Sequence, residues 1–530
     1  MMKTISYISF LLIFISTLIP NSFYPWTSFW MESISLVGLL VLIIYILKKN
    51  NKLKVDIYSL GFFSAFIIII FINLLLRVNV FTGDYYFGIL YSTAFILSVL
   101  VGQNLTEKNI ALIVFTVISL ISAILAIVQW SQPGLDNLYI RNIPLDARPF
   151  ANLGQPNHLS TILTIGLFCF FIISEKLSTI TKLLVVIIFC FALALTQSRT
   201  GILQLVVASL LFFHFDKKNR MLYIASLFIY FLSFILITKL VDFTHIDSSR
   251  DLIQEGLKTT RIQHWISLFD STKQLFGHGI LSTAHVHLTE ANNPAKEGTL
   301  TYAHNIFIDL ILWFGLIPGF ILTSLLIASC RPPLKESLDP SQNKIWTLFA
   351  IFFIHCLLEY PFAYLHLLIP AGIFLGISKN KINKSMLQIS NKILYPVYLA
   401  IIIISGLIFI ETIKISPKIE SLRYLDMNFI EESKIHKDNY LFINQLNSYV
   451  MHRHGRPKEN ISASELADYN NAAYRFASAP LLFRAAIANK YYGNTKQSDY
   501  FLQKICQLNT DDICKHYIKS YENFFLNSAR

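Results

Sequence analysis

The sequence predicts an all-α membrane protein: a polytopic membrane helix bundle of about 12–13 transmembrane helices, with a large external loop and a C-terminal helical-hairpin domain. Three observations lead to this prediction. Apolar residues make up 54% of the 530 residues, and charged residues make up only 14%. The apolar residues fall into long runs, and basic residues gather in alternate loops between the runs. This composition excludes a soluble enzyme and an acidic disordered chain.

The apolar runs follow one another along the first 410 residues. A helix needs about 20 residues to cross a hydrocarbon layer of about 30 Å, so the length of each run decides whether it qualifies as a span. We expect helices near Ile5–Pro20, Ile34–Leu47, Ile57–Leu76, Tyr86–Val101, Ile110–Trp130, Asn157–Ile173, Leu183–Leu195, Ile202–Phe213, Met221–Leu240, Asn305–Ser329, Ile345–Leu358, Phe362–Ile377 and Leu394–Ile410.

The net charge of +12 indicates membrane topology, and no nucleic-acid partner is expected. Four basic loops fall on the same side if every run spans once. They contain Lys48, Lys49, Lys52 and Lys54; Lys217, Lys218 and Arg220; Arg331, Lys335 and Lys344; and Lys379, Lys381, Lys384 and Lys392. Because basic loops stay cytoplasmic, we expect a cytoplasmic N-terminus. The expected domains are a transmembrane domain over 1–410, with external loops at 131–156 and 241–302, and an external helical domain over 411–530.

The six cysteines divide into two groups. Four of them lie in or beside expected membrane helices and are expected to pack there, namely Cys169, Cys190, Cys330 and Cys356. Cys506 and Cys514 lie in the tail outside the cytoplasm, where a disulfide persists, and we expect them to form one.

Three histidines in the large external loop, His278, His285 and His287, raise the question of a metal site. Glu290 is the only carboxylate nearby, and no cysteine stands at an offset typical of a zinc ligand. We therefore predict no metal and no cofactor. The glycine-bearing stretch around these histidines is expected to act as a gate over an active site.

One stretch, Leu300–Gly319, places His304 and Asn305 where a polar loop meets a long apolar helix. The stretch has two ionisable residues, His304 and Asp309. A histidine at this boundary can exchange protons with a substrate. The alternative is an interfacial histidine whose ring is satisfied by a lipid headgroup or a backbone carbonyl.

Polar residues from other segments reach the same external surface. Gln155 and Asn157 flank a proline at the start of a helix, where they either cap the helix or face an anionic or sugar ligand. Arg199 lies in a tight external hairpin and either snorkels to lipid phosphates or binds a substrate phosphate. Glu359 and Tyr360 stand at a helix break, where polar groups at membrane depth indicate a packed or wet site.

The external loop also contains a segment expected to lie on the membrane. The apolar spacing of SSRDLIQEGLKTTRIQHWISLFD, residues 248–270, predicts a surface helix. Arg261, His264 and Trp265 lie on this helix. The C-terminal tail predicts helical hairpins similar to tetratricopeptide units, without a clean repeat period.

Four stretches together resemble a known family. They read RPFANLGQPNHLS at 148–160, SRTG at 198–201, YAHNIFIDLILWFGLIPG at 302–319 and HCLLEYPFAYLHLLIP at 355–370. In order, they resemble the O-antigen ligase and polymerase superfamily. The NLxQPN and LxEYP elements resemble its protein O-oligosaccharyltransferase branch, the PglL-type pilin glycosylation ligases. The sequence departs from that branch at Gly154, where an asparagine is common, and at Asp309 and Trp313, where a glutamine and a glutamate are common.

The resemblance implies transfer of a glycan from undecaprenyl diphosphate to a Ser or Thr hydroxyl of a pilin or another exported protein. It places the active site and the C-terminal domain in the periplasm, on a multi-pass protein of the bacterial inner membrane. His304 is the expected general base, in a direct, inverting displacement that needs no metal. The expected substrate-binding residues are Gln155, Asn157, Arg199, Arg261, Asn305, Glu359 and Tyr360, with the two arginines holding the diphosphate.

Two alternatives remain open from the sequence. An O-antigen ligase or polymerase would use the same donor with a sugar hydroxyl as acceptor. A multi-span transporter is the alternative of another class, because many helices with a few polar residues are typical of one. Transporters, however, tend to place polar residues near the bilayer midplane in two related halves, whereas the polar residues of this chain gather at one surface.

Overall fold

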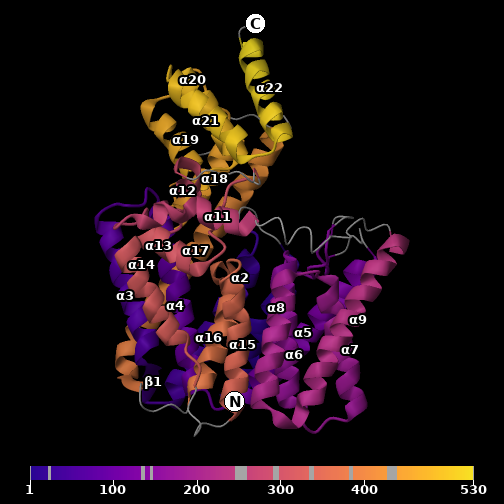
Figure 1. The fold of residues 1–530 in the computed structure, drawn as a ribbon. Helices are drawn as coiled ribbons and strands as arrows, with labels where there is room; N and C mark the ends of the chain where they lie inside the picture. The colour runs from indigo at the N-terminus through magenta and orange to yellow at the C-terminus, as the bar shows by residue number, and fades with distance from the viewer. Residues whose placement is uncertain are drawn as a thin grey trace.

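The computed structural model describes residues 2–21, 26–132, 138–143, 147–244, 260–290, 296, 298–333, 340–380, 386–426 and 439–528. The described chain is almost entirely helical and confirms the predicted all-α fold. A broad bundle of apolar helices carries a smaller helical domain on one end, and the chain starts at the opposite end (Figure 1).

The helices of the bundle run roughly parallel to one another in Figure 1. Among the described residues, seven helices are long and apolar enough to cross a membrane, and five further apolar helices are shorter. The protein is therefore a multi-pass membrane protein, as the apolar runs predicted. The bundle contains α1 (Met2–Ile15), α2 (Phe29–Lys49), α3 (Ile57–Leu75), α4 (Thr82–Asn104), α5 (Lys108–Ser131), α6 (Pro156–Ile173), α7 (Thr179–Leu195), α8 (Arg199–Phe215), α9 (Arg220–Thr244), α13 (Ile306–Phe314), α14 (Leu316–Cys330), α15 (Pro340–Cys356), α16 (Leu365–Lys379) and α17 (Asn391–Asp426).

The long helix expected over Asn305–Ser329 is wrong, because the chain breaks at Gly315 into α13 and α14. Gly315 has a φ of 91°, a conformation that glycine adopts without steric cost. The freed backbone groups find partners in the preceding loop. The amides of His278 and Gly279 donate to the carbonyls of Leu312 and Trp313, at 3.0 and 2.9 Å. The loop before α13 thus hydrogen-bonds to the backbone at this break.

Replacement of Gly315 by alanine is expected to destabilise the protein by about 1–3 kcal/mol, the usual cost of a side chain forced into such a conformation. An added Cβ would also lie 2.3 Å from the carbonyl oxygen of Leu275. Gly406→Ala on α17 is the matched control, since its Cβ would meet nothing within 4 Å. Thermal unfolding in detergent measures this effect. Equal melting temperatures of the two variants would contradict the expectation.

Two features of the bundle were not predicted. A two-stranded antiparallel ribbon, β1 (Lys52–Asp56) with β2 (Met386–Ser390), lies at the end of the bundle opposite the C-terminal domain (Figure 1). The expected division at residue 410 falls inside α17, a single helix of 36 residues. Local pattern did not reveal either feature, because strand pairing joins segments more than 300 residues apart and α17 continues through Pro396 and Pro417, although proline usually interrupts a helix.

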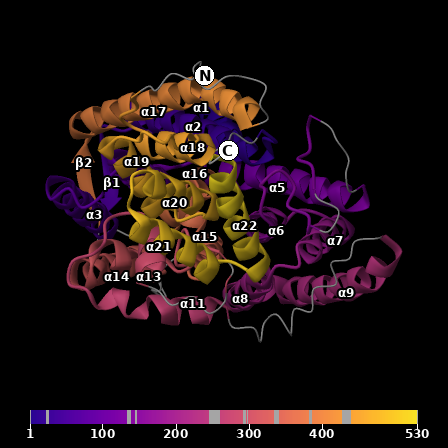
Figure 2. The same cartoon turned by 90° about the horizontal axis from the view of Figure 1, so that it is seen from above.

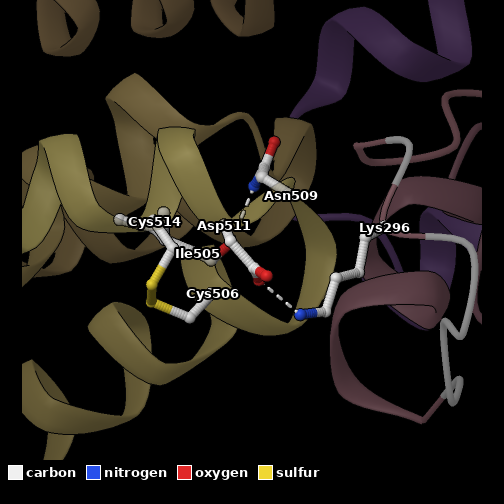
Figure 3. The surroundings of a disulfide bond; sticks show 6 residues. All are labelled: Lys296, Ile505, Cys506, Asn509, Asp511 and Cys514. Atoms are coloured by element: carbon white, nitrogen blue, oxygen red, sulfur yellow. Dashed lines mark hydrogen bonds and ion pairs between the residues drawn. A yellow bond between two sulfur atoms is a disulfide. The ribbon is translucent and has the colours of Figure 1, made fainter.

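The C-terminal domain consists of helical hairpins, as predicted. Its helices are α18 (Asn444–His454), α19 (Ala463–Phe476), α20 (Ala479–Tyr491), α21 (Thr495–Leu508) and α22 (Asp511–Ser528). The expected disulfide between Cys506 and Cys514 is present and joins the end of α21 to the start of α22 (Figure 3). Seen from above, these helices cover the middle of the bundle, whereas α7 and α9 lie at its edge (Figure 2).

The domain also packs against the loop that leads into α13. Helix α12 (Thr283–Thr289) contributes Ala284 and Leu288 to the domain's apolar core. Beyond α12, the amide of Gly298 donates to the carbonyl of Leu508 at 2.7 Å, and the hydroxyl of Thr299 donates to the carbonyl of Ala477 at 2.6 Å. Lys296 forms an ion pair with Asp511 next to the disulfide (Figure 3). The C-terminal domain therefore holds the chain just before residue 304.

Candidate active site

His304 lies between the external loop and α13, in a left-handed backbone conformation with a φ of 55°. Non-glycine residues rarely adopt this conformation, and they do so mostly where surrounding contacts impose it. Asn305 follows as the cap of α13, because its side-chain oxygen accepts from the amides of Phe307 and Ile308. Its side-chain nitrogen donates to the carbonyl of Leu357 at 3.2 Å. Asn305 thus ties the start of α13 to the end of α15.

A buried carboxylate meets the His304 ring. The Nδ1 atom of His304 lies 2.5 Å from Oε2 of Glu359, whose residue is only 4% exposed. Burial alone would raise the pKa of the Glu359 carboxyl, but the hydrogen bond and charge of His304 and the charge of Arg261 outweigh burial, so this pKa lies below its usual value. An ionised carboxylate only accepts, so Nδ1 carries the proton, and a neutral ring keeps its lone pair on Nε2.

Arg261 binds the other oxygen of the same carboxylate. Its guanidinium forms an ion pair with Oε1 of Glu359, and the Arg261 side chain remains 29% exposed. Arg261 lies on α11 (Thr260–Phe269), the described part of the surface helix expected over 248–270; residues 248–259, with Arg250, lie outside the described residues. The indole of Trp265 on α11 donates to the carbonyl of Ala303 at 2.8 Å. One short helix thus contacts both Glu359 and the residue before His304.

Hydrogen bonds extend from Glu359 to the starts of α6 and α8. The side-chain nitrogen of Asn157 donates to Oε1 of Glu359 at 3.0 Å, and the side-chain oxygen of Asn157 accepts from the hydroxyl of Ser198 at 2.8 Å. The Ser198 hydroxyl also accepts from the amide of Gly201, which caps α8. Arg199 is the first residue of that helix and is exposed. Three segments far apart in the sequence therefore bind one carboxylate, and the start of α8 is linked to it through Asn157.

Tyr360 packs against the other side of His304. Its ring meets the His304 ring edge-on, with centroids 5.0 Å apart, and stacks on Tyr302 at 4.8 Å. Burial, and then the charge of Glu359, raises the pKa of the Tyr360 phenol, which stays protonated. Gln155 occupies the position just before α6, is half-buried and makes no capping bond to that helix. The structure does not link the Gln155 side chain to the hydrogen bonds of Glu359.

Comparison with known proteins shows the family of this chain. Residues 184–324 match the O-antigen ligase family, and residues 344–433 match the C-terminal region of a virulence-factor membrane-bound polymerase family. The ComP-specific O-oligosaccharyltransferase of Acinetobacter baylyi (strain ATCC 33305 / BD413 / ADP1) is 30% identical over 495 residues, which cover 88% of each chain.

This chain belongs to the O-antigen ligase superfamily, in its O-oligosaccharyltransferase branch. A second relative from the same organism, the general O-oligosaccharyltransferase, is 26% identical over 400 residues, covering 69% of this chain and 68% of the relative. The expected family membership is thereby confirmed, and the protein is an enzyme of the oligosaccharyltransferase type.

The sequence left the role of Asp309 open. In this oligosaccharyltransferase, Asp309 positions the backbone next to His304. The fully buried Asp309 accepts at Oδ1 from the amide of Ala303 at 2.9 Å and from the hydroxyl of Thr283 at 2.7 Å. The indole of Trp313 donates to the same hydroxyl at 2.9 Å. Asp309 and Trp313 are four residues apart and so lie on one face of α13. Two of the three departures from the family pattern therefore belong to one network.

Sequence reasoning missed Glu32, a buried carboxylate at the start of α2. It accepts from Trp26 at 2.9 Å, from Ser28 at 2.5 Å, from the amide of Leu365 at 3.2 Å and from the hydroxyl of Tyr91. Glu32 thereby holds the first residue of α16, five residues after Tyr360. The signal was an acidic residue beside an apolar run, which indicates a buried and paired group.

The three loop histidines have separate contacts. His278 faces Glu290 at 3.8 Å, His285 packs on the ring of Tyr474, and the Nδ1 atom of His287 accepts from the amide of Leu300 at 3.3 Å. Within the described ranges, no group of three or more His, Cys, Asp or Glu side chains is placed to hold a metal ion. His287 instead holds the segment of the chain that leads to His304.

Acid is expected to weaken this support. Burial lowers the pKa of His287 to about 4. Between about pH 6.5 and pH 4 the folded protein then binds fewer protons here than the unfolded chain, so stability present above pH 6.5 is lost as the pH falls, by about 1.4 kcal/mol per unit. Melting temperatures of wild type should fall more steeply from pH 7.5 to 5 than those of His287→Gln. Equal slopes would contradict the expectation, and His516→Gln, at an exposed site, is the control that keeps the wild-type slope.

Proposed function

We propose that this protein is a protein O-oligosaccharyltransferase that moves a glycan en bloc from undecaprenyl diphosphate to a Ser or Thr hydroxyl of a pilin or another exported protein. The names of the two relatives support protein O-glycosylation. The observation that carries the chemistry is the His304–Glu359 pair, with Arg261 on the same carboxylate. The reaction takes place on the periplasmic side of the inner membrane, where the C-terminal domain lies, and the N-terminus is cytoplasmic.

His304 acts as the general base. As the acceptor oxygen bonds to the anomeric carbon of the glycan, its proton passes to Nε2 of His304, and the bond from that carbon to the diphosphate oxygen breaks. Undecaprenyl diphosphate leaves with the electron pair of the broken bond, and the anomeric centre is inverted. Glu359 holds the ring through Nδ1 and stabilises the imidazolium that forms. The exposed fraction of the His304 side chain, 26%, lets a substrate reach the ring.

Arginines take the charge of the leaving group. A guanidinium offers five N–H donors, so Arg261 binds a phosphate oxygen while it keeps its contact with Glu359. Arg199 lies at the start of α8, next to the serine that Asn157 contacts, and supplies a second positive charge there. The positive ends of α6 and α8 add to this field. This set performs the charge neutralisation that a metal performs in other transferases.

Gln155 and Tyr360 complete the substrate-binding set. The amide of Gln155 makes no capping bond, so it is placed to orient a sugar or acceptor hydroxyl near Asn157. The protonated Tyr360 phenol donates to a phosphate or sugar oxygen. Asn157 and Asn305 act mainly by positioning, since both polar atoms of each side chain contact the protein.

The deciding experiment removes this protein from its host and measures intact masses of pilins and other exported proteins. Loss of the glycan mass from one or more of these proteins, restored by wild-type protein, is the expected result. If the deletion instead removes the glycan from lipopolysaccharide, the acceptor is a sugar and the proposal fails. A solute-uptake defect with intact glycans would favour a transporter.

A further inference from the structure

An arginine without a partner lies in the loop between α5 and α6, close to the start of α6. Arg141 is half-buried, and among the described residues its guanidinium makes no hydrogen bond and no ion pair. Burial lowers the pKa of Arg141, and no neighbouring carboxylate offsets this effect. By contrast, Arg148 on the same loop donates to the carbonyls of Thr196 and Gln197. Because a guanidinium stays charged in a protein, Arg141 keeps a positive charge that nothing described balances.

Two buried amide side chains fix the backbone of Arg141. The side-chain oxygen of Asn152 accepts from the Arg141 amide at 2.9 Å, and the side-chain nitrogen of Gln129 donates to the Arg141 carbonyl at 2.8 Å. Asn152 and Gln129 are only 1% and 2% exposed. Gln129 also binds both backbone groups of Ala151. The loop therefore presents the guanidinium from a backbone that is already ordered, which reduces the entropy cost of binding a ligand.

Gly154 leaves the space in which the guanidinium lies. It has a φ of 76°, and a Cβ added there would lie 2.3 Å from Nη1 and 3.2 Å from Cζ of Arg141. Three residues further on, Asn157 donates to Glu359 in the active site. A chain spans at most about 3.6 Å per residue, so the Cα atoms of Gly154 and Asn157 are within about 11 Å of each other. Arg141 thus lies near the active site but outside the contacts on Glu359.

The neighbours of Arg141 are of the types that bind sugars. Gln155 follows Gly154, and its side-chain amide makes no capping bond to α6. Tyr139 is 78% exposed, and its carbonyl accepts from Asn152, the side chain that also holds the Arg141 amide. A sugar acid presents a carboxylate, hydroxyl groups and apolar C–H faces. A guanidinium, an amide and an aromatic ring complement these three groups.

Two other anionic groups of the reaction fit Arg141 less well. The diphosphate must lie at the bond that breaks, beside His304, where Arg261 and Arg199 supply positive charge. An acidic side chain of the acceptor protein would pair with Arg141, but it has no ring of hydroxyl groups for the neighbouring amide and aromatic side chains. The carboxylate of a sugar uses all three.

We propose that Arg141 binds the carboxylate of an acidic sugar, the first or second from the diphosphate, and thereby makes the enzyme select donors that contain one. A planar guanidinium can bind both oxygens of a carboxylate, and such paired, charge-assisted hydrogen bonds are strong. The inference rests on the proposed transfer reaction and names the substrate class of the same site. Arg141 is a specificity residue in this role and takes no part in proton transfer.

The test uses the full-length protein in detergent, with the acceptor protein that the deletion experiment identifies and three synthetic polyprenyl diphosphate disaccharides. Two of these donors contain glucuronic acid, as the first or as the second sugar, and the third contains glucose at both positions. Wild type should use at least one acidic donor with a kcat/KM about 10-fold or more above that of the neutral donor, the usual effect of a hydrogen bond to a charged group. Arg141→Gln should remove this preference, mainly through KM, and leave the neutral donor unchanged.

Three further variants sharpen the test. Arg141→Lys keeps the charge without the planar fork and should retain part of the preference. Gly154→Asn leaves Arg141 in the chain but fills its space, and asparagine tolerates a positive φ better than most residues, so the preference should fall again. This variant also serves if Arg141→Gln fails to fold. Arg456→Gln, at an exposed position between α18 and α19, is the control that keeps the wild-type preference.

The donors separate the possible ligands. An equal fall of kcat/KM with all three donors would mean that Arg141 binds the diphosphate they share. If removal of acidic residues beside the glycosylated Ser or Thr abolished the effect of Arg141→Gln, the acceptor would be the ligand. Either result, or an unchanged preference in Arg141→Gln, would overturn the inference while wild-type transfer stands. Absence of wild-type transfer from every donor would contradict the proposed function itself, and the inference with it.

Discussion

His304→Ala is expected to reduce glycan transfer by about 10²- to 10⁴-fold, the usual contribution of a general base, and so to below detection in a pilin glycosylation assay. The acceptor hydroxyl is a weak nucleophile, and without the imidazole no group at this position takes its proton. Intact mass of the acceptor protein, together with the amount of the variant in the membrane, is the measurement. Near-normal glycosylation would contradict the role given to His304.

Two further variants test whether the loss of transfer comes from the missing imidazole or from misfolding. His304 has a φ of 55°, which alanine tolerates poorly and asparagine tolerates better, so His304→Asn removes the imidazole and preserves the backbone. Both substitutions should therefore abolish transfer. His214→Ala, at the exposed end of α8 away from the site, should leave transfer unchanged.

Glu359→Gln is expected to lower the turnover number by about 10²-fold or more, since a neutral amide neither fixes the Nδ1 proton nor stabilises the imidazolium. The substitution keeps the size of the side chain, so loss of charge is the main change. Because the pKa of Glu359 is lowered, wild type should keep its ionised carboxylate at moderately acidic pH. Steady-state kinetics with a lipid-linked donor and an acceptor peptide would measure the effect.

The kinetics also separate two roles for Glu359. If Glu359 acts through His304, the turnover number falls and KM changes little. A raised KM with an unchanged turnover number would instead mean that Glu359 binds substrate directly, and the positioning role would be wrong. Glu290→Gln is the control, because that carboxylate faces His278 in the external loop and has no contact with His304 or Arg261.

Arg261 contacts the His304–Glu359 pair. It shares the Glu359 carboxylate with His304, so the proposed base and the proposed leaving-group site contact the same side chain.

Much of the fold followed from the sequence. Apolar runs identified the membrane helices, the position of Cys506 and Cys514 in the polar tail indicated the disulfide, and apolar periodicity found the helix that contains Arg261. These features depend on local composition, which acts through hydrophobic burial and helix periodicity. The break at Gly315 was missed, because its φ matters only where residues of the preceding loop meet the freed carbonyls.

The sequence by itself determined that this protein is a multi-pass membrane enzyme and which polar residues stand at the ends of its apolar helices, since single residues such as His304 and Arg199 are conspicuous in apolar surroundings. Only the tertiary structure decided how they combine. It placed His304, Arg261 and Asn157 on the one carboxylate of Glu359, and it assigned Asp309 to the backbone before His304. The physical reason is that hydrogen bonds between distant segments depend on helix packing, and no local spacing in the chain encodes which helix ends meet.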